Sequence, residues 1–196
     1  MLVFIDIETS ALYAGHHRDS NGFLYYGELL EVAVIREDGK EYVWRMHPEK
    51  PSLHDPKSMS INGYNNRKHN YLTEPWRNHI KRIHETLAVP GTLYVGHNVQ
   101  FDVHWLNFWF EKAGLPPIPV RCLDTMTLAH EHLTPCGLRG LGFDKIRKFL
   151  GWELRDCHDA LNDCRDVKRL FQTLRRATLF DRLIWRFTGL CISKWL

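Results

Sequence analysis

A short, uninterrupted apolar segment opens the chain at residues 2–5. Such a run is typical of a strand that is buried on both faces in the middle of a sheet. Two further runs with β-type composition, 29–36 and 41–46, flank the dipeptide Asp38-Gly39. Because Asp-Gly accommodates positive φ, these two runs indicate strands joined by a tight turn. We therefore predict a central strand together with an antiparallel hairpin.

Helical spacing of apolar residues dominates the second half of the chain. Apolar side chains at 101, 105, 106, 109 and 110 predict an amphipathic helix that Gly114 and Pro116 terminate. We also predict helices over 74–87, 138–150 and 160–174, short strands over 93–95 and 121–125, and loops or irregular structure over 10–27 and 47–73. A hairpin followed by alternating strands and helices favours an α/β fold, with a mixed β-sheet flanked by α-helices.

The length and composition of the chain indicate the class of protein to which it belongs. The chain has 196 residues, of which 44% are hydrophobic and 25% charged, as in an ordinary globular protein rather than a disordered or collagen-like one. This length fits a single domain over residues 1–196. The first apolar run is too short for a secretory signal or a membrane span. We expect a cytoplasmic location and no membrane association.

Positive charge gathers near the end of the sequence. Residues 165–196 hold eight Lys and Arg against two Asp. This basic face could meet a polyanion, and a solvated helix surface explains it equally well. From about residue 176 the chain forms a basic, aromatic extension that contains Trp185, Arg186, Lys194 and Trp195. The extension could enlarge a nucleic-acid surface, dock a partner or pack on the core, and we favour core packing.

Four carboxylates occupy positions that the pattern predicts to be interior. Asp6 and Glu8 are two residues apart at the end of the first strand, so their side chains leave the same face. Asp102 lies on the apolar side of its helix, and Asp163 lies on the apolar stripe of the last long helix, whereas Asp166 is expected to face solvent. Acids from three separate segments therefore point toward one interior.

Such a group of acids requires compensation. Burying an unpaired carboxylate costs several kcal/mol, so the cluster calls for bound cations. Oxygen ligands alone favour Mg²⁺ or Mn²⁺, and two such ions can activate a water and stabilise the leaving oxygen of a phosphodiester. The alternative is that these are separate carboxylates at strand ends and helix starts, where acids are common.

Three motifs contain these acids and occur in a fixed order. They are Asp6-Ile7-Glu8-Thr9, His97-Asn98-Val99-Gln100-Phe101-Asp102 and His158-Asp159-Ala160-Leu161-Asn162-Asp163. Together they resemble the motifs of the DnaQ-like 3′-to-5′ exonucleases of the DEDDh type, and the resemblance extends over residues 1 to about 175. It implies a ribonuclease-H-like α/β fold.

The resemblance also implies roles for individual residues. Asp6, Glu8, Asp102 and Asp163 would hold two divalent ions, Mg²⁺ or Mn²⁺, and His158 would be the general base that takes a proton from the attacking water. An imidazole with a pKa near 6.5 suits that task. The residues expected to contact the terminal nucleotide are Thr9, Ile61, His97, Asn98 and Phe101. Phe101 is explained equally well as a core residue.

The implied activity is hydrolysis of the terminal phosphodiester of DNA or RNA, from a free 3′ end, to nucleoside 5′-monophosphates. Two alternatives stay open: an endonuclease of the same broad fold, and a non-catalytic nucleic-acid-binding module. Proofreading would require a polymerase or another protein partner. The sequence leaves open the choice between DNA and RNA, the preference for single strands or duplexes, the oligomeric state, and whether residues 10–27 line a substrate entrance.

Overall fold

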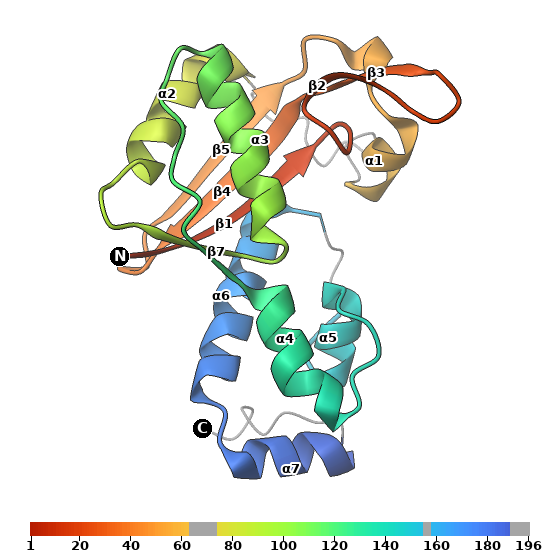
Figure 1. Ribbon diagram of the computed structural model, residues 1–196, viewed down its shortest axis with the longest axis vertical. Helices are drawn as coiled ribbons and strands as arrows, with labels where there is room; N and C mark the ends of the chain where they lie inside the picture. The colour runs from red at the N-terminus through yellow and green to blue at the C-terminus, as the bar shows by residue number, and fades with distance from the viewer. Residues whose placement is uncertain (63–73, 155–157, 189–196) are drawn as a thin grey trace.

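A mixed sheet forms the centre of the molecule. The computed structural model describes residues 1–62, 74–154 and 158–188, and its six-stranded sheet has the order β6-β5-β4-β1-β7-β8 (Figure 1). The strands are β1 (Leu2–Thr9), β4 (Leu29–Arg36), β5 (Glu41–His47), β6 (Glu74–Pro75), β7 (Leu93–Gly96) and β8 (Cys122–Asp124). β4 runs antiparallel to β1 and β5, whereas β7 is parallel to β1 and β8. The predicted central strand, hairpin and mixed sheet are confirmed.

Helices cover both faces of this sheet. α2 (Trp76–Leu87) and α3 (Val99–Lys112) lie on the near side in Figure 1, where Val3, Ile5 and Ile7 of β1 join their core. Phe4 points to the other face and packs in a core with residues of α6 (Ala160–Arg176). Because successive side chains of a strand alternate between faces, β1 is buried on both sides, as its continuous apolar run predicts.

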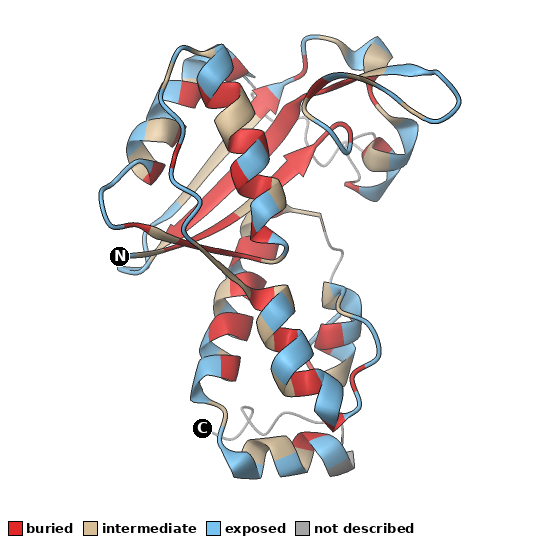
Figure 2. Cartoon of the chain, viewed as in Figure 1, coloured by how far each residue is buried: buried red, intermediate tan, exposed pale blue. Residues whose placement is uncertain are grey.

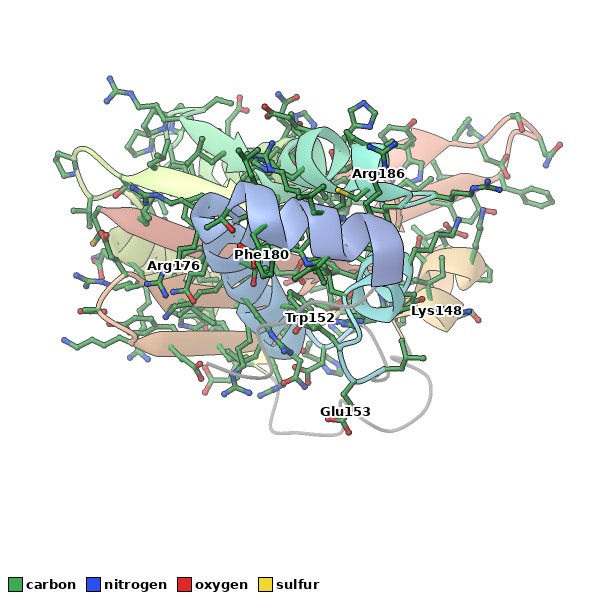
Figure 3. All side chains as sticks on the ribbon, turned by 90° about the horizontal axis from the view of Figure 1, so that it is seen from below. Lys148, Trp152, Glu153, Arg176, Phe180 and Arg186 are labelled. Carbon is green, nitrogen blue, oxygen red and sulfur yellow. The ribbon has the colours of Figure 1, made fainter. Side chains whose placement is uncertain are left out.

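A second core lies below the sheet in Figures 1 and 2. It is formed by the end of α6 and by α4 (Thr125–Leu133), η3 (Thr134–Cys136), α5 (Phe143–Phe149) and α7 (Leu179–Thr188). Trp185 of α7 is only 2% exposed and packs in this core with Trp152, which agrees with core packing for that part of the extension. Arg186 is exposed, and Figure 3 shows it on α7. Lys194 and Trp195 lie outside the described residues.

The prediction of a loop over 10–27 is wrong, since this segment contains a second hairpin, β2 (Gly15–Arg18) and β3 (Leu24–Gly27). Its base is fixed by a hydrogen bond of 3.0 Å from the backbone N–H of Ser10 to the carbonyl oxygen of Glu28. The Ser10 hydroxyl also donates to the carbonyl of Tyr26 at 3.2 Å. Hydrogen bonds of this kind leave no periodic apolar pattern in the sequence.

Four helical segments differ from the prediction as well. Within the segment expected to be irregular, η1 (Pro51–Leu53) and α1 (Pro56–Ile61) form, and the Asp55 side chain caps α1 by accepting from the backbone N–H of Lys57; residues 63–73 lie outside the described part. The helix expected from 138 begins only at Phe143, after Gly140 with a φ of 93°. The sequence pattern does not predict α4. No helix within the described residues is long and apolar enough to cross a bilayer.

Candidate active site

The carboxyl end of β1 carries Asp6 and Glu8. Their side chains leave the face that α6 covers, because they share the parity of Phe4, which packs against that helix. On the neighbouring strand β4, Glu31 lies directly opposite Glu8 in the antiparallel register. Glu31 is fully buried, and one of its carboxylate oxygens lies 3.2 Å from a guanidinium nitrogen of Arg45 on β5. The sequence analysis did not single out Glu31, although this acid stands inside an otherwise apolar strand.

Asp102 is delivered by the first turn of α3. The preceding residue at the helix start, Asn98, has a left-handed φ of 68°, which Asn tolerates better than most residues. This turn brings Asp102 inward, where it is 4% exposed. A hydrogen bond from the backbone of Ile7 reaches the Asp102 carboxylate. Asp102 therefore lies against the end of β1 that carries Asp6 and Glu8, and its interior position is confirmed.

Asp163 and His158 come from the start of α6. The Asp159 side chain caps this helix by accepting from the backbone N–H of Asn162 at 3.0 Å. Asp163 is in the first turn and is 8% exposed. The backbone N–H of His158 donates to Oδ2 of Asp163 at 2.8 Å, and His158 itself has a left-handed φ of 71°. Such backbone strain in a residue other than glycine is concentrated at functional sites.

The three segments meet at one point. Ligand atoms of Glu8, His158 and Asp163 all lie within 4.8 Å of one another. Asp102 is close enough to Asp6 for its charge to raise the pKa of Asp6. Asp6, Glu8, His158 and Asp163 also line a common cleft of about 320 Å³. The structure thus brings together all five residues that the motif resemblance links to metal binding and catalysis.

Without a cation, these carboxyl groups hold their protons tightly. Burial, followed by the charge of Asp102, raises the pKa of Asp6 well above its ordinary value. Burial also raises the pKa of Glu8 to about 9, and the charge of Asp163 adds to this shift. Burial raises the pKa of Asp102 in the same way, although backbone hydrogen bonds favour its ionised form. Ionising the cluster therefore costs free energy unless positive charge enters it.

The donor set fits divalent cations. Carboxylate oxygens from Asp6, Glu8, Asp102 and Asp163 are the hard ligands that Mg²⁺ and Mn²⁺ prefer. Burial, the largest cause of the raised pKa values of Asp6, Glu8 and Asp102, disfavours their ionised forms, and a bound cation would favour them. Among the described residues, Glu8, His158 and Asp163 form the one group of three or more ligand atoms close enough to share an ion.

The cleft is also lined by His97 and by the first residues of α5. His97, Phe143 and Asp144 line it, and the ring of His97 lies 4.2 Å from that of Phe143 between centroids. Nε2 of His97 donates to the carbonyl oxygen of Leu141 at 2.6 Å, and its Nδ1 lies 3.0 Å from Oγ1 of Thr125. Burial lowers the pKa of His97, and the contacts at both ring nitrogens fix the imidazole in the wall of the cleft.

The other residues expected to bind the nucleotide do not line this cleft. The Thr9 hydroxyl donates to the carbonyl oxygen of Ala11 at 2.9 Å. Phe101 is half-buried and packs against the core beneath α3, as its core interpretation anticipated. Ile61 is 50% exposed at the end of α1, and its neighbour Asn62 donates to the carbonyl oxygen of Thr9 at 2.9 Å. This last bond holds α1 beside the end of β1.

The exposed position expected for Asp166 is wrong. Asp166 is 1% exposed, and its Oδ2 accepts a 3.0 Å hydrogen bond from Nε of Arg147 on α5. Arg147 is equally buried and also donates from Nη2 to Oδ1 of Asp163 at 2.8 Å. The sequence spacing does indicate the burial of Asp166, because this residue stands three residues after Asp163 and four before the buried Leu170, on the same side of the helix.

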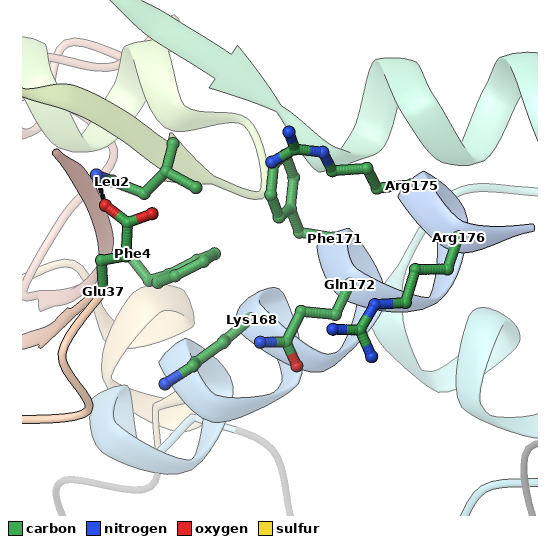
Figure 4. A pocket seen from close by; sticks show the side chains of 8 residues that line it. All are labelled: Leu2, Phe4, Glu37, Lys168, Phe171, Gln172, Arg175 and Arg176. Carbon is green, nitrogen blue, oxygen red and sulfur yellow. Dashed lines mark hydrogen bonds between the residues drawn. The ribbon is translucent and has the colours of Figure 1, made fainter. Parts of the chain in front are cut away.

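A second hollow, of about 340 Å³, lies at the far end of α6 (Figure 4). Phe4 and Phe171 form its apolar part, and Lys168, Arg175 and Arg176 contribute positive charge. It contains none of the acids described above. The two hollows are thus separated along α6, and the acidic cleft is the one at the carboxyl end of β1.

Relatives in solved structures share the fold. E. coli Exonuclease I in complex with a dT13 oligonucleotide aligns with a TM-score of 0.69 and 22% identity, covering 93% of this chain and 42% of that chain. Exonuclease I in its apo form aligns with a TM-score of 0.71 and 21% identity, covering 95% and 44%. The ribonuclease-H-like architecture implied by the motifs is confirmed.

Curated relatives agree in sequence. DNA polymerase III of the PolC type from Staphylococcus haemolyticus is 25% identical over 174 residues, which is 86% of this chain. The PolC-type polymerase of Staphylococcus aureus gives the same identity over the same length. This chain spans only 11% of the length of these relatives. The RNase T family model, described as Exonuclease, matches residues 3–171. Because that match runs from β1 into α6 and covers most of the chain, the chain belongs to the RNase T family of DnaQ-like exonucleases.

Proposed function

We propose that the chain is a metal-dependent 3′-to-5′ exonuclease that hydrolyses the terminal phosphodiester of DNA or RNA to nucleoside 5′-monophosphates. The observation that carries the proposal is the convergence of Glu8, His158 and Asp163, whose ligand atoms lie within 4.8 Å of one another. Two chain segments far apart in sequence supply these groups to one cleft, and Asp102 from a third segment is close enough to raise the pKa of Asp6. A merely structural role does not require buried acids with raised pKa values.

Asp6, Glu8, Asp102 and Asp163 are the residues that would hold two divalent ions. When bound, such ions activate a water and stabilise the leaving oxygen of a phosphodiester. The buried carboxylates supply the negative charge that binds them, and the rigid strand and helix ends fix the positions of the oxygens. One solved relative is the zinc ion bound form of an E. coli ExoI–ssDNA complex, and this supports divalent ion binding here.

His158 would take the proton of the attacking water. Its backbone is held by the hydrogen bond to Asp163, and its side chain lines the cleft together with the acids. A neutral imidazole accepts a proton at physiological pH, and a positioned general base contributes about 10²–10⁴-fold to a rate. The position of His158 in the cleft and the basicity of its imidazole therefore support its role as the general base. The acids, as cation ligands, would not fill that role.

The direction of attack and the nature of the substrate rest on the motif resemblance. DnaQ-like exonucleases of the DEDDh type act from a 3′ end, and the solved relatives include complexes with dT13 and dA16 oligonucleotides. We extend this to a nucleic acid with a free 3′ end as the substrate here. PolC-type relatives carry the matching segment within a polymerase, which makes a polymerase a candidate partner if the chain proofreads.

The test is digestion of end-labelled oligonucleotides with purified protein. DNA and RNA oligomers, single-stranded and paired, are incubated with Mn²⁺, with Mg²⁺ and with EDTA. A 5′ label should give a ladder that shortens from the 3′ end, with nucleoside 5′-monophosphate as product. Asp6→Asn, which keeps the shape of the side chain, should abolish release while the thermal unfolding temperature in EDTA does not fall.

Circular single-stranded DNA and RNA separate the competing functions. An enzyme that needs a free end leaves both circles intact, whereas cleavage of a circle identifies an endonuclease. Absence of any hydrolysis in Mn²⁺, with retained binding of oligonucleotides, identifies a non-catalytic binding module. Activity retained in Asp6→Asn protein would remove the mechanism.

A further inference from the structure

We propose that Arg147 and Asp166 are a positioning pair that aims the Asp163 carboxylate and the His158 segment at the cleft. The inference rests on the proposed function, since Asp163 and His158 are the groups it positions. Neither Arg147 nor Asp166 belongs to the three motifs. Both are 1% exposed, so neither is available as a surface contact for substrate.

The guanidinium of Arg147 bridges two carboxylates of α6. Its Nη2 donates to Oδ1 of Asp163 at 2.8 Å, and its Nε donates to Oδ2 of Asp166 at 3.0 Å. Nη2 also contacts Oδ2 of Asp166. The planar fork of arginine suits this two-point grip on carboxylates, and lysine lacks that geometry. Arg147 therefore fixes the orientation of α5 against the first turns of α6.

The hydrogen bonds of Arg147 continue through Asp163 to the backbone of His158. One oxygen of Asp163 accepts from Arg147, and the other accepts from the backbone N–H of His158 at 2.8 Å. His158 has a φ of 71°, a conformation that persists only when surrounding contacts hold it. A continuous series of hydrogen bonds thus runs from Asp166 through Arg147 and Asp163 to the backbone of His158.

Charge explains why Asp166 is required in addition to Arg147. A buried arginine paired with Asp163 alone would neutralise that carboxylate and compete with a cation for it. With Asp166 also paired to Arg147, the three charges sum to one negative charge. Asp166 thus balances the positive charge of the Arg147 guanidinium. Arg147 can then orient Asp163 without cancelling the attraction of the Asp163 carboxylate for a divalent ion. Asp144, whose Oδ1 lies 3.6 Å from Nη1 of Arg147, adds further negative charge at the cleft edge.

The experiment measures Mn²⁺ binding at equilibrium by calorimetry, independently of hydrolysis. Asp166→Asn keeps the shape of the side chain but removes the charge, and Arg147→Lys keeps the charge but removes the fork. Both should weaken Mn²⁺ binding by about 10–100-fold, the usual effect of losing a group that orients a metal ligand. They should also lower kcat with little change in KM for an oligonucleotide. Asp166→Glu, which restores the charge, should recover most of the Mn²⁺ affinity.

Arg165→Met is the matched control. Arg165 lies on the same helix and pairs with Glu41 at 3.0 Å, at a position that is largely exposed. Its loss should leave Mn²⁺ affinity within about two-fold of the wild type, since exposed ion pairs contribute little. If Asp166→Asn does not fold, the comparison of Arg147→Lys with Asp166→Glu decides the question by the same readout.

The outcomes separate this inference from the proposed function. Wild-type hydrolysis and Mn²⁺ binding, with unchanged Mn²⁺ affinity in Asp166→Asn and Arg147→Lys, would overturn the positioning role and leave the exonuclease assignment standing. A lowered unfolding temperature alone would have the same meaning, because it reports only a structural ion pair. Wild-type protein that neither binds Mn²⁺ nor hydrolyses any oligonucleotide would overturn both.

Discussion

Glu8 on β1 lies directly opposite Glu31 on β4, in an antiparallel pair whose side chains share one face of the sheet. Like charges placed opposite each other in a sheet are destabilising, and here both residues are buried. The charge of Glu31 is one of the causes that raise the pKa of Glu8. Ionising Glu8 beside Glu31 therefore costs free energy, and a bound cation would offset that cost.

A first prediction concerns the pH dependence of stability without metal. In the folded protein the pKa of Glu8 is raised from 4.5 to about 9, so between these values the folded state binds more protons than the unfolded chain. The contribution of Glu8 to the free energy of unfolding then falls as pH rises through this interval. Urea denaturation in EDTA at about pH 5.5 and about pH 8.5, both inside the interval, should show lower stability at the higher pH.

Two variants serve as controls for this prediction. Glu8→Gln removes the titrating group and should reduce the difference in stability between the two pH values. Glu31→Gln should reduce it less, because it removes only a neighbouring charge. Addition of Mn²⁺ to the wild type should abolish much of the difference, since the ion binds the ionised carboxylates. Equal stability of the wild type at both pH values in EDTA would contradict the raised pKa.

A second prediction isolates the imidazole of His158. Asn tolerates the left-handed region that His158 occupies, and it keeps the backbone N–H that binds Asp163. His158→Asn should therefore preserve the fold and the helix start while removing the general base. We expect kcat for mononucleotide release to fall by about 10²–10⁴-fold, with KM within a few-fold of the wild type.

His104→Asn is the corresponding control, because His104 is an exposed histidine on α3. It should retain wild-type kcat. A His158→Asn protein that keeps more than about a tenth of the wild-type kcat would show that another group accepts the proton.

The sequence predicted the interior positions of the motif acids because period and position agreed for them, whereas it missed Glu31. Asp6, Asp102 and Asp163 interrupt apolar stripes, and a stripe that faces the interior carries its polar members there as well. The same spacing also places Asp166 on the buried side, one turn after Asp163, but its own helix offers no partner that would make burial of a second acid tolerable. That partner is Arg147, which lies on another helix and which no local pattern brings to Asp166.

The hairpin over β2 and β3 was missed for a different reason. Its strands are held by backbone hydrogen bonds, such as the bond from Ser10 to Glu28, and by contacts between rings on opposite strands, such as those of His16 and Tyr26, and the backbone comes close to Tyr13 at Gly27. Such contacts leave little trace in hydrophobic periodicity. Local patterns therefore predicted the central sheet and the long helices better than the segments whose shape depends on contacts distant in sequence.

A third prediction tests that close approach. A Cβ atom added at Gly27 would overlap the carbonyl oxygen of Tyr13 and lie 2.6 Å from Cη2 of Trp105. Because the first of these is a backbone atom, the strand itself must shift. Gly27→Ala should lower the free energy of unfolding by about 1–3 kcal/mol. In Gly142→Ala the new atom meets nothing within 4 Å, and the loss should stay under about 1 kcal/mol.

Urea denaturation of both glycine variants checks this expectation. A Gly27→Ala protein as stable as the wild type would show that β3 can move away from Tyr13 at little cost. The hairpin would then be a mobile element beside the end of β1.

A fourth prediction concerns α7, which follows the segment matched by the exonuclease family. Trp185 is 2% exposed within the core that α4, α5 and the end of α6 share, whereas Phe180 on the same helix is 67% exposed; Figure 3 shows Phe180 on α7. If α7 belongs to one cooperative unit with the rest of the chain, Trp185→Ala should cost about 3–5 kcal/mol of unfolding free energy. Phe180→Ala should change it by less than about 0.5 kcal/mol.

Both variants should unfold in a single transition that tryptophan fluorescence and circular dichroism report at the same urea concentration. The physical reason is that the core around Trp185 includes Leu170 and Leu174 of α6, the helix whose first turn carries Asp163. Loss of Trp185 therefore weakens packing at one end of the helix that supplies the cleft at its other end. A Trp185→Ala protein with unchanged stability would instead make α7 an appendage, and the single-domain organisation would then end near residue 176.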